Sequence, residues 1–323
     1  MTRFEELLGA IKSKNIYIQT HNFPDPDAIA SAYGLSNLLK SKNIDSTICY
    51  WGVIDRCNTA QMINALGITL LDSSTLPPLN SDDEVIFVDA QKGNSNISSH
   101  DVKLFSCIDH HPFGTETSYI FKDIRPETGA CSSIIAEYYF DNNIKIDSNT
   151  ATALLYGIKI DTNNLTRGVS ELDLDMMYRL YKYVDKDILQ SLEHNSIEIS
   201  DLHAYSNAID NIQIHGDISF ANTGCNCPEA LIATISDFML SLSNIHLSVV
   251  YSTLSTGIKL SIRSDDTFYD SGKICKNALA GIGNGGGHSS MAGGFIPLDE
   301  TKDMDDIIKQ RFLDAAIQNK ELN

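Results

Sequence analysis

The sequence has no run of 18 or more consecutive apolar residues, and its first residues, MTRFEELLGAIKSK, show an amphipathic pattern without a long apolar core. The first absence argues against a transmembrane helix, and the second argues against a secretory signal peptide. We therefore expect a cytoplasmic protein that does not associate with a membrane.

Basic residues are few. Lysine and arginine number 24 against 42 aspartates and glutamates, which gives a formal net charge of −18. A protein that binds long nucleic acids without sequence preference needs a large basic surface, so the charge argues against that class. It does not exclude a small anionic substrate in one pocket, where local charges and metal ions decide.

Cysteine is present but lacks a binding pattern. The seven cysteines are irregularly spaced, and Cys225 and Cys227 are the only close pair. A structural zinc site of the usual kind would need a second pair of ligands, which is absent. We expect reduced and mostly buried thiols. The sequence also shows no internal repeat and no low-complexity tract.

The length of 323 residues and the hydrophobic content of 42% are those of a globular protein of two domains. Over 1–185, apolar periodicities predict strands at 15–20, 46–52, 84–90 and 104–109 and helices at 2–13, from about 27, at 129–140 and at 149–160. Strands that alternate with helices predict a doubly wound, mostly parallel α/β sheet.

The remainder of the chain divides in two. Residues 186–208 are polar and helical and are interpreted as a connector. Residues 209–323 are richer in strands, with helices expected at 227–241 and 271–281 and a hairpin turn in STLSTG, which indicates a smaller α/β domain with a mixed sheet.

The stretch HNFPDPDA crowds His21, Asp25 and Asp27 between a strand pattern and a helix pattern. In an open α/β sheet, ligands bind at the carboxyl ends of the strands, so these side chains should point into a binding crevice. Close carboxylates repel each other unless they are solvated or share a cation. The simpler alternative is that Asp27 caps the next helix and His21 is a surface loop residue.

Acidic residues and histidines end three further apolar runs: Asp89, then Asp109 with His110 and His111, then Asp161. A mixed set of histidines and carboxylates suits Mn²⁺ or another first-row divalent ion better than structural zinc. The number of these groups indicates two ions, and a carboxylate such as Asp89 could bridge them.

The order and spacing of these motifs resemble those of the DHH phosphoesterase superfamily, and GNGGGHSSMAGG at 283–294 resembles the glycine-rich signature of the DHH-associated C-terminal domain of the first type. That domain type occurs in RecJ-like exonucleases, nano-RNases and cyclic-dinucleotide phosphodiesterases. The resemblance covers nearly the whole chain. It departs from the usual pattern at Pro26, where glycine is common, and at 289–291, after the histidine of the signature.

The resemblance implies roles for particular residues. Asp109 would orient a histidine, and His111 would face the scissile phosphate, the alternative for His111 being a packing residue. The implied metal ligands are His21, Asp25 and Asp89 for one ion and Asp27, Asp89, His110 and Asp161 for the other.

The second domain would bind the substrate. Gly285, Gly286 and Gly287 would form a loop whose N–H groups bind an anion, with His288 and Arg263 as further phosphate ligands. Taken alone, a glycine loop is often a mere turn and an isolated arginine is usually a surface residue.

The sequence thus predicts a Mn²⁺-dependent phosphodiesterase of the nano-RNase type, with its active site in the cleft between the domains. Its substrates would be short RNA or DNA oligonucleotides, linear dinucleotides or nucleoside bisphosphates. The alternatives are a pyrophosphatase or exopolyphosphatase, a RecJ-like single-strand exonuclease, and a non-catalytic nucleotide sensor. Substrate length, cyclic or linear form, a homodimeric state, and the roles of Arg125 and Arg167 stay open.

Overall fold

A computed structural model describes residues 1–54, 57–94, 96–112, 118–194, 199–265, 269–297 and 304–321. The chain forms two compact units, Met1–Ser196 and Ile197–Asn323. The division falls inside the segment 186–208 expected to be a connector. Its first part forms a helix of the first unit, and its last part forms a helix of the second unit.

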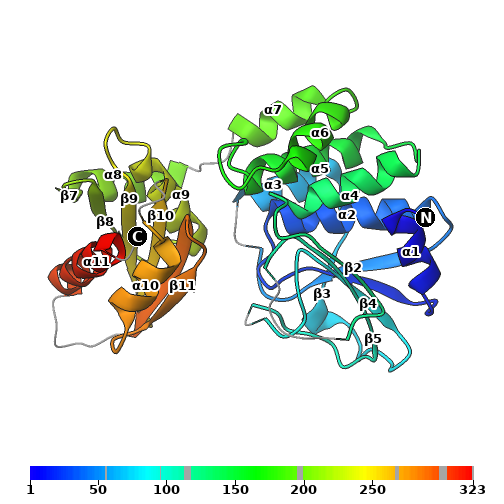
Figure 1. The fold of residues 1–323 in the computed structure, drawn as a ribbon, viewed down its shortest axis with the longest axis horizontal. Coiled ribbons are helices and arrows are strands. Elements are labelled where there is room, and N and C mark those ends of the chain that lie inside the picture. The colour runs from blue at the N-terminus through cyan, green and yellow to red at the C-terminus, as the bar shows by residue number, and fades with distance from the viewer. Residues whose placement is uncertain are drawn as a thin grey trace. The chain divides into compact units, whose positions relative to one another are not determined.

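The first unit alternates helices and strands (Figure 1). Its elements are α1 (Arg3–Ala10), β1 (Ile16–Gln19), α2 (Pro26–Lys40), β2 (Ser46–Tyr50), α3 (Cys57–Leu66), β3 (Leu71–Asp72), the 3₁₀ turn η1 (Ser73–Thr75), β4 (Glu84–Val88), β5 (Leu104–Asp109), β6 (Phe121–Ile124), α4 (Cys131–Asp141), α5 (Ser148–Asp161), α6 (Glu171–Leu180) and α7 (Lys186–His194).

The sheet of this unit confirms the predicted parallel architecture. Its six strands run in the order β3-β2-β1-β4-β5-β6, and all five neighbouring pairs are parallel. The strand order reverses between β1 and β4. In doubly wound sheets this reversal opens a crevice at the carboxyl ends of the two strands, so residues that follow β1 and β4 lie where ligands are usually bound.

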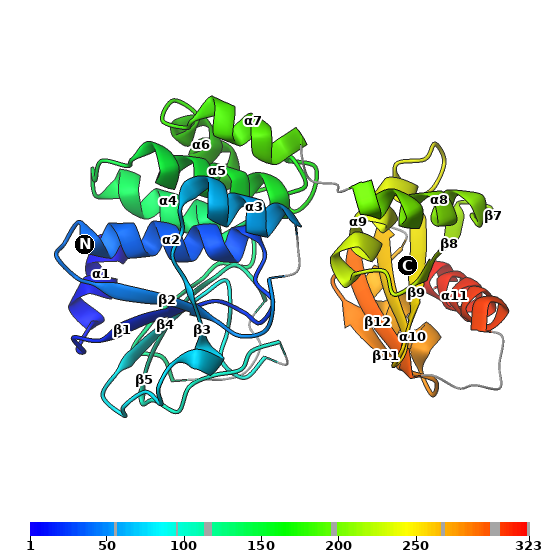
Figure 2. The ribbon, with the colours of Figure 1, turned by 180° about the vertical axis from the view of Figure 1, so that it is seen from behind.

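Helices α2 to α7 gather over one face of this sheet in both views (Figures 1 and 2). The apolar residues expected on one face of the second helix, Ala28, Ala32, Leu35 and Leu39, are all fully buried. They belong to the main core, which also contains inward-facing residues of β1, β4, α4 and α5. The opposite face of the sheet carries a smaller cluster around Phe87 and Phe105, whose rings stack with centroids 5.9 Å apart.

The second unit contains a mixed sheet, as predicted. Its strands lie in the order β11-β12-β10-β9-β8-β7, and only the β8–β9 pair is parallel. Its elements are the 3₁₀ turn η2 (Ile199–Asp201), α8 (Leu202–Asp210), β7 (Gln213–His215), β8 (Ile218–Cys225), α9 (Glu229–Leu240), β9 (Leu247–Leu254), β10 (Gly257–Ser264), α10 (Ser271–Leu279), β11 (Asn284–Gly287), β12 (Met291–Pro297) and α11 (Met304–Glu321).

Two apolar clusters hold helices on both faces of this sheet, one with α8 and α9 and the other with α10 and α11. The predicted hairpin turn lies between β9 and β10. None of the described helices in either unit is long and apolar enough to cross a membrane.

The glycine-rich segment corrects a prediction. Residues expected to form a loop form the edge strand β11, antiparallel to β12. A Cβ atom on Gly285 would lie 2.5 Å from the Cys275 sulfur and 2.8 Å from Leu279, both on α10. Glycine at this position therefore lets the helix pack against the strand, whereas a Cβ at Gly286 would meet open space.

Candidate metal centre

The loop after β1 brings the first group of polar side chains to the reversal of strand order. Asp25 is the N-cap of α2, because its side chain accepts the N–H of Ala28 at 3.1 Å and Pro26 occupies the first helical turn. The helix cap is thus Asp25, not Asp27. His21 directs its Nε2 toward Asp25, 3.8 Å from the carboxylate, so His21 is not simply a surface residue.

Asp27 is fully buried in the first turn of α2. Its two oxygens accept the backbone N–H groups of Cys131 at 2.8 Å and Ser132 at 3.0 Å, at the start of α4. Asp27 therefore caps a neighbouring helix rather than its own. The positive end of that helix stabilises the buried carboxylate beneath the site.

Asp89 lies at the centre of the cluster. It follows β4 directly, is 3% exposed and adopts a left-handed backbone with φ of 53°. Its Oδ2 lies 3.5 Å from Nε2 of His21, and its Oδ1 lies 3.2 Å from Nε2 of His110. One carboxylate thus faces two histidines from different elements, which is the geometry that a bridging ligand requires.

The two histidines are oriented alike. Nδ1 of His21 lies 2.8 Å from the carbonyl oxygen of Asn22, and Nδ1 of His110 lies 3.0 Å from that of Thr128. A carbonyl oxygen only accepts, so each Nδ1 carries a proton, and the lone pair of Nε2 in the neutral ring becomes available to a cation placed between the histidine and the carboxylates. Metal-binding histidines show this arrangement.

Asp161 ends α5 with a carboxylate oxygen 3.1 Å from Nε2 of His110. Its own carbonyl accepts an N–H of Arg167 at 3.1 Å. Between these two residues, 163–165 all have φ between 46° and 65°. Asparagine tolerates a left-handed backbone, as at 163 and 164, whereas Leu165 is strained there, and such strain is concentrated at functional sites. The turn therefore places Arg167 beside the proposed ligand Asp161.

Asp109 is fully buried and holds His111. Its Oδ1 accepts Nδ1 of His111 at 2.9 Å and the N–H of His110 at 2.8 Å, and its Oδ2 accepts the Gln91 amide at 2.7 Å. Gln91 also donates to the carbonyl of His111 at 3.1 Å. The sequence analysis missed Gln91, although it lies only two residues after Asp89.

The cluster is electrostatically incomplete without a cation. Burial, together with the charges of Asp89 and Asp161, holds the pKa of Asp27 well above its usual range, and burial also raises the pKa of Asp89. Burial alone would lower the pKa of His21, but the hydrogen bond and charge of Asp25 and the charge of Asp89 outweigh it and raise that pKa to about 9. A divalent cation would supply the positive charge that protons otherwise bring.

Two buried atoms at the centre, Oδ1 of Asp89 and Nε2 of His110, lie 3.2 Å apart, yet neither makes a hydrogen bond of normal geometry to the described residues. Unsatisfied buried polar atoms are costly and rare, and a metal ion would satisfy both. Ligand atoms within 4.8 Å of one another form three groups: His21, Asp25 and Asp89; Asp27, His110 and Asp161; and Asp89, Asp109, His110 and His111. These imidazole and carboxylate donors fit a first-row divalent ion.

Arg125, whose role was open, is structural. Its guanidinium donates twice to Asp123, at 2.9 and 2.8 Å, and once to Glu137 at 2.6 Å. The Tyr138 hydroxyl donates to the same aspartate at 2.7 Å. The network joins β6 to α4 and leaves Arg125 engaged by protein carboxylates.

The candidate substrate-binding residues all lie in the second unit, at one end of its sheet. Arg263 of β10 is in register with Met291 of β12, and Gly287 of β11 pairs with the next residue, Ala292. The N–H of His288 donates to the carbonyl of Met291 at 2.7 Å. Three adjacent strands therefore bring Arg263, Gly287 and His288 together.

The Arg263 side chain is not solvated. Its Nε lies 3.1 Å from Asp237 on α9, and Nη1 donates to the Ser261 hydroxyl at 3.0 Å. The ion pair with Asp237 therefore engages and orients the guanidinium.

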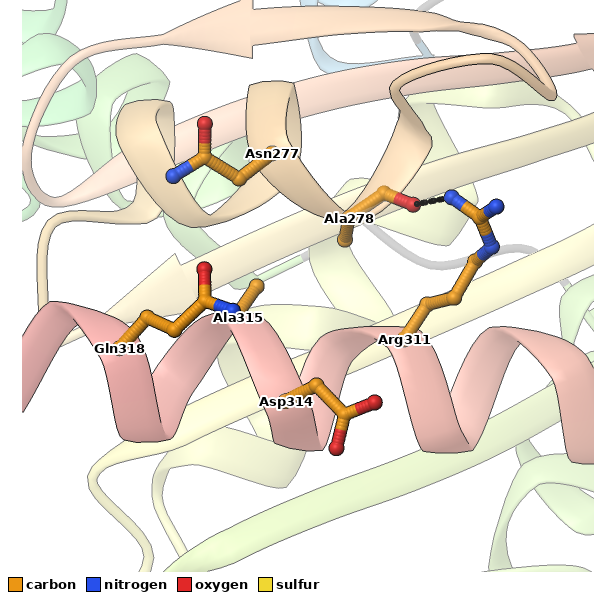
Figure 3. Close-up of a pocket in the computed structure, with 6 residues that line it drawn as sticks. All are labelled: Asn277, Ala278, Arg311, Asp314, Ala315 and Gln318. Carbon is orange, nitrogen blue, oxygen red and sulfur yellow. Dashed lines mark hydrogen bonds between the residues drawn. The ribbon is translucent and has the colours of Figure 1, made fainter.

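A cavity of about 300 Å³ lies elsewhere in the second unit, between α10 and α11 (Figure 3). Arg311 points from α11 to the end of α10 and donates to the carbonyls of Ala278 and Ala280 at 3.0 and 2.9 Å. It thereby caps that helix. The lining contains none of the candidate site residues and consists of Asn277, Ala278, Arg311, Asp314, Ala315 and Gln318.

Comparison with known proteins identifies the first unit. Residues 15–158 match the model of the DHH family, N-terminal domain. This range contains the first five candidate metal ligands and ends three residues before Asp161. This match to a DHH family domain confirms the resemblance over residues 15–158.

Relatives of known sequence extend the match. The uncharacterized protein MJ1633 of Methanocaldococcus jannaschii is 32% identical over 313 residues, which are 96% of this chain and 64% of that protein. A probable manganese-dependent inorganic pyrophosphatase of Streptococcus thermophilus is 27% identical over 152 residues, 46% of this chain and 48% of its own length. The cyclic-di-AMP phosphodiesterase GdpP of Bacillus subtilis is 24% identical over 73% of this chain and 39% of its own length. The chain thus spans only part of these relatives.

Among solved structures, an exopolyphosphatase-related protein from Bacteroides fragilis has a similar fold. It superposes with a TM-score of 0.78 at 18% sequence identity and covers 99% of this chain and 97% of its own. At this identity the likeness concerns the fold alone.

Proposed function

We propose that this chain, a member of the DHH family by its residues 15–158, is a Mn²⁺-dependent phosphodiesterase for short oligonucleotides, linear dinucleotides or nucleoside bisphosphates. The observation that carries the proposal is the set of carboxylates and histidines around Asp89, at the reversal of strand order in the sheet. The manganese-dependent relatives support the choice of metal.

Two divalent ions bound here would supply an activated water and stabilise charge on the phosphoryl oxygens. His21, Asp25 and Asp89 would hold one ion. Asp89 would bridge to the second, whose further ligands would be Asp27, His110 and Asp161. The carbonyls of Asn22 and Thr128 keep both histidines in the tautomer that offers Nε2.

His111 is suited to act on the leaving group. Its Nδ1 lies 2.9 Å from Oδ1 of Asp109, so Nε2 would be the atom that meets a substrate. With a proton on both nitrogens, His111 can donate the Nε2 proton to the leaving alkoxide as a general acid. Gln91 supports this arrangement because it fixes the second oxygen of Asp109.

A phosphodiester substrate is favoured over pyrophosphate by the extent of the matches. The match to GdpP covers 73% of this chain. The matched segment is longer than the first unit and therefore includes part of the second. The match to the pyrophosphatase covers 46% of it. In the proposal, the second unit binds the substrate phosphate with Arg263, Gly285, Gly286, Gly287 and His288.

The proposal is tested with a substrate panel in Mn²⁺: pApA, cyclic di-AMP, 3′-phosphoadenosine-5′-phosphate, pyrophosphate and a long single strand. We expect the highest kcat/KM on pApA or on the bisphosphate, and none in a control with Asp89→Asn. Preferential hydrolysis of pyrophosphate would favour the pyrophosphatase alternative, and processive degradation of the long strand would favour the exonuclease.

A further inference from the structure

Phe23 is an exposed aromatic residue inside the metal-binding loop. It lies two residues after His21 and two before Asp25, and 56% of its surface is exposed. Two residues span at most about 7 Å, so the ring is attached beside two proposed metal ligands. We propose that Phe23 is a stacking platform for the nucleobase of a substrate whose phosphate is bound at the metals. This inference rests on the proposed function and specifies its substrate class.

The backbone at Phe23 does not favour phenylalanine. Its φ is 56°, a left-handed conformation that glycine and asparagine adopt readily and that is strained for bulky residues. Burial does not compensate for this strain, because the ring is largely exposed. Local folding therefore gives no reason for an aromatic side chain at this position, and a contact with a ligand would give one.

The platform is held rigidly. The N–H of Phe23 donates to the carbonyl of Trp51 at 2.9 Å, and the preceding N–H, of Asn22, donates to the carbonyl of Asn96 at 2.9 Å. Trp51 packs in turn against His100, with ring centroids 5.3 Å apart. The loop is thus fixed from two sides, and a rigid aromatic ring loses little conformational entropy when it binds a ligand.

One side of the ring is already supported by protein. A Cβ atom on Gly52 would lie 2.9 Å from two carbon atoms of the Phe23 ring, so the ring rests on the backbone of Gly52. A ring supported on one side and exposed elsewhere can accept a flat ligand. Nucleobases stack on such rings with little preference among bases, and each stacked base contributes about 5- to 150-fold in affinity. Inorganic pyrophosphate and polyphosphate have no group that could use the platform.

The first test is binding to the Mn²⁺-loaded protein, followed by the fluorescence of Trp51, the one tryptophan in the sequence. The probes are AMP and ribose 5-phosphate, which differ only in the base. Phe23→Asn should keep or raise the melting temperature, because asparagine tolerates the left-handed backbone, yet weaken AMP binding by about 5- to 150-fold. Ribose 5-phosphate affinity should not change, and Phe23→Tyr should retain AMP binding.

The matched control is Tyr178→Ala, which removes an aromatic ring that is 82% exposed on α6 and should leave AMP binding unchanged. The proposal is overturned if Phe23→Asn binds AMP as tightly as the wild type. It is also overturned if the wild type binds AMP no more tightly than ribose 5-phosphate.

A second test separates this inference from the proposed function. Hydrolysis of pApA is compared with that of the same dinucleotide carrying abasic sugars. Phe23→Asn should lower kcat/KM on pApA but not on the abasic compound, whereas equal losses on both would overturn the platform. If the wild type hydrolyses neither compound, the proposed function fails, and the AMP binding contrast still decides the role of Phe23.

Discussion

At the scale of single residues, the division of labour between two adjacent histidines is the most informative feature of the site. Nε2 of His110 faces Asp89 and Asp161, whereas His111 is bound through Nδ1 to Asp109. The same ring type thus serves as a proposed metal ligand in one position and a proposed proton donor in the next. The difference comes from which nitrogen the protein holds.

This division predicts opposite effects of two substitutions. His111→Ala should keep the bound Mn²⁺ but lower kcat by about 10²- to 10⁴-fold, the usual effect of losing a general acid. His110→Ala should lose Mn²⁺. Metal analysis of the dialysed variants, together with kcat, checks both. The opposite result, with Mn²⁺ lost from the His111 variant and retained in the His110 variant, would exchange the two roles.

The candidate ligands could be proposed from the sequence because they lie at or shortly after the ends of apolar runs, where parallel strands bring side chains to one edge. The groups that orient these candidate ligands could not be predicted in the same way. The Gln91 amide contacts Asp109, and the carbonyl of Thr128 contacts His110. In each pair the two residues are 18 positions apart in the chain. Neither a glutamine nor a backbone carbonyl carries a sequence pattern that predicts such a contact.

At the scale of elements, the site depends on the close approach of α2, α4 and α5. A Cβ atom on Gly157 of α5 would lie 2.4 Å from the Ser132 hydroxyl and 3.0 Å from a carboxylate oxygen of Asp27. The absence of a side chain at Gly157 therefore allows α5 to pack directly beneath the buried carboxylate. The glycine is part of the support of the metal centre.

Gly157→Ala should accordingly lower the free energy of unfolding by about 1–3 kcal/mol, the typical cost of overpacking a core, and weaken Mn²⁺ binding. Gly9→Ala in α1 is the matched control, because a Cβ at that position meets nothing within 4 Å. It should be neutral or stabilise by up to about 1 kcal/mol. Urea unfolding of both variants measures the difference. Equal stability of the two would contradict the packing account.

The Asp123 network between β6 and α4 predicts a pH dependence of stability. Burial raises the pKa of Asp123, but the hydrogen bonds and charge of Arg125 outweigh it and hold the pKa below its usual value. The stabilisation is therefore fully present above the unfolded-state pKa, about 3.9, and is lost as the pH falls through the lower folded-state pKa.

Asp123→Asn should thus lower the free energy of unfolding by about 1–3 kcal/mol at pH 7. The difference from the wild type should shrink as the pH falls below about 4. Urea denaturation at several pH values checks this. A difference that stayed constant down to pH 3 would show that the charge of Asp123 is not what stabilises the network.

Sequence patterns predicted several of the central strands and helices of both units, because strong apolar periodicity accompanies burial. They did not predict α3, α6 or α11, the last of which spans 18 residues, nor the edge strand β6 or the strand β11. The glycines of β11 were interpreted as a loop because glycine usually marks turns, whereas Gly285 serves the packing of α10 on the sheet. Such a contact joins residues from different elements and has no local signature.

At the scale of the whole molecule, the two units carry different parts of the proposed reaction. All six proposed metal ligands, together with His111 and Phe23, belong to the first unit. Arg263, Gly287 and His288 belong to the second. Substrate selection by residues of both units remains a prediction, and the net charge of −18 argues against a large basic surface for long nucleic acids.

The most direct test of the central claim is the number of Mn²⁺ ions bound per chain, measured by equilibrium dialysis of the wild type and of Asp89→Ala. The account predicts two ions in the wild type and a loss at both sites in the variant, because Asp89 faces the histidines of both ligand groups. A variant that still bound two ions with the affinity of the wild type would contradict the ligand assignment, and with it the proposed metal-dependent chemistry.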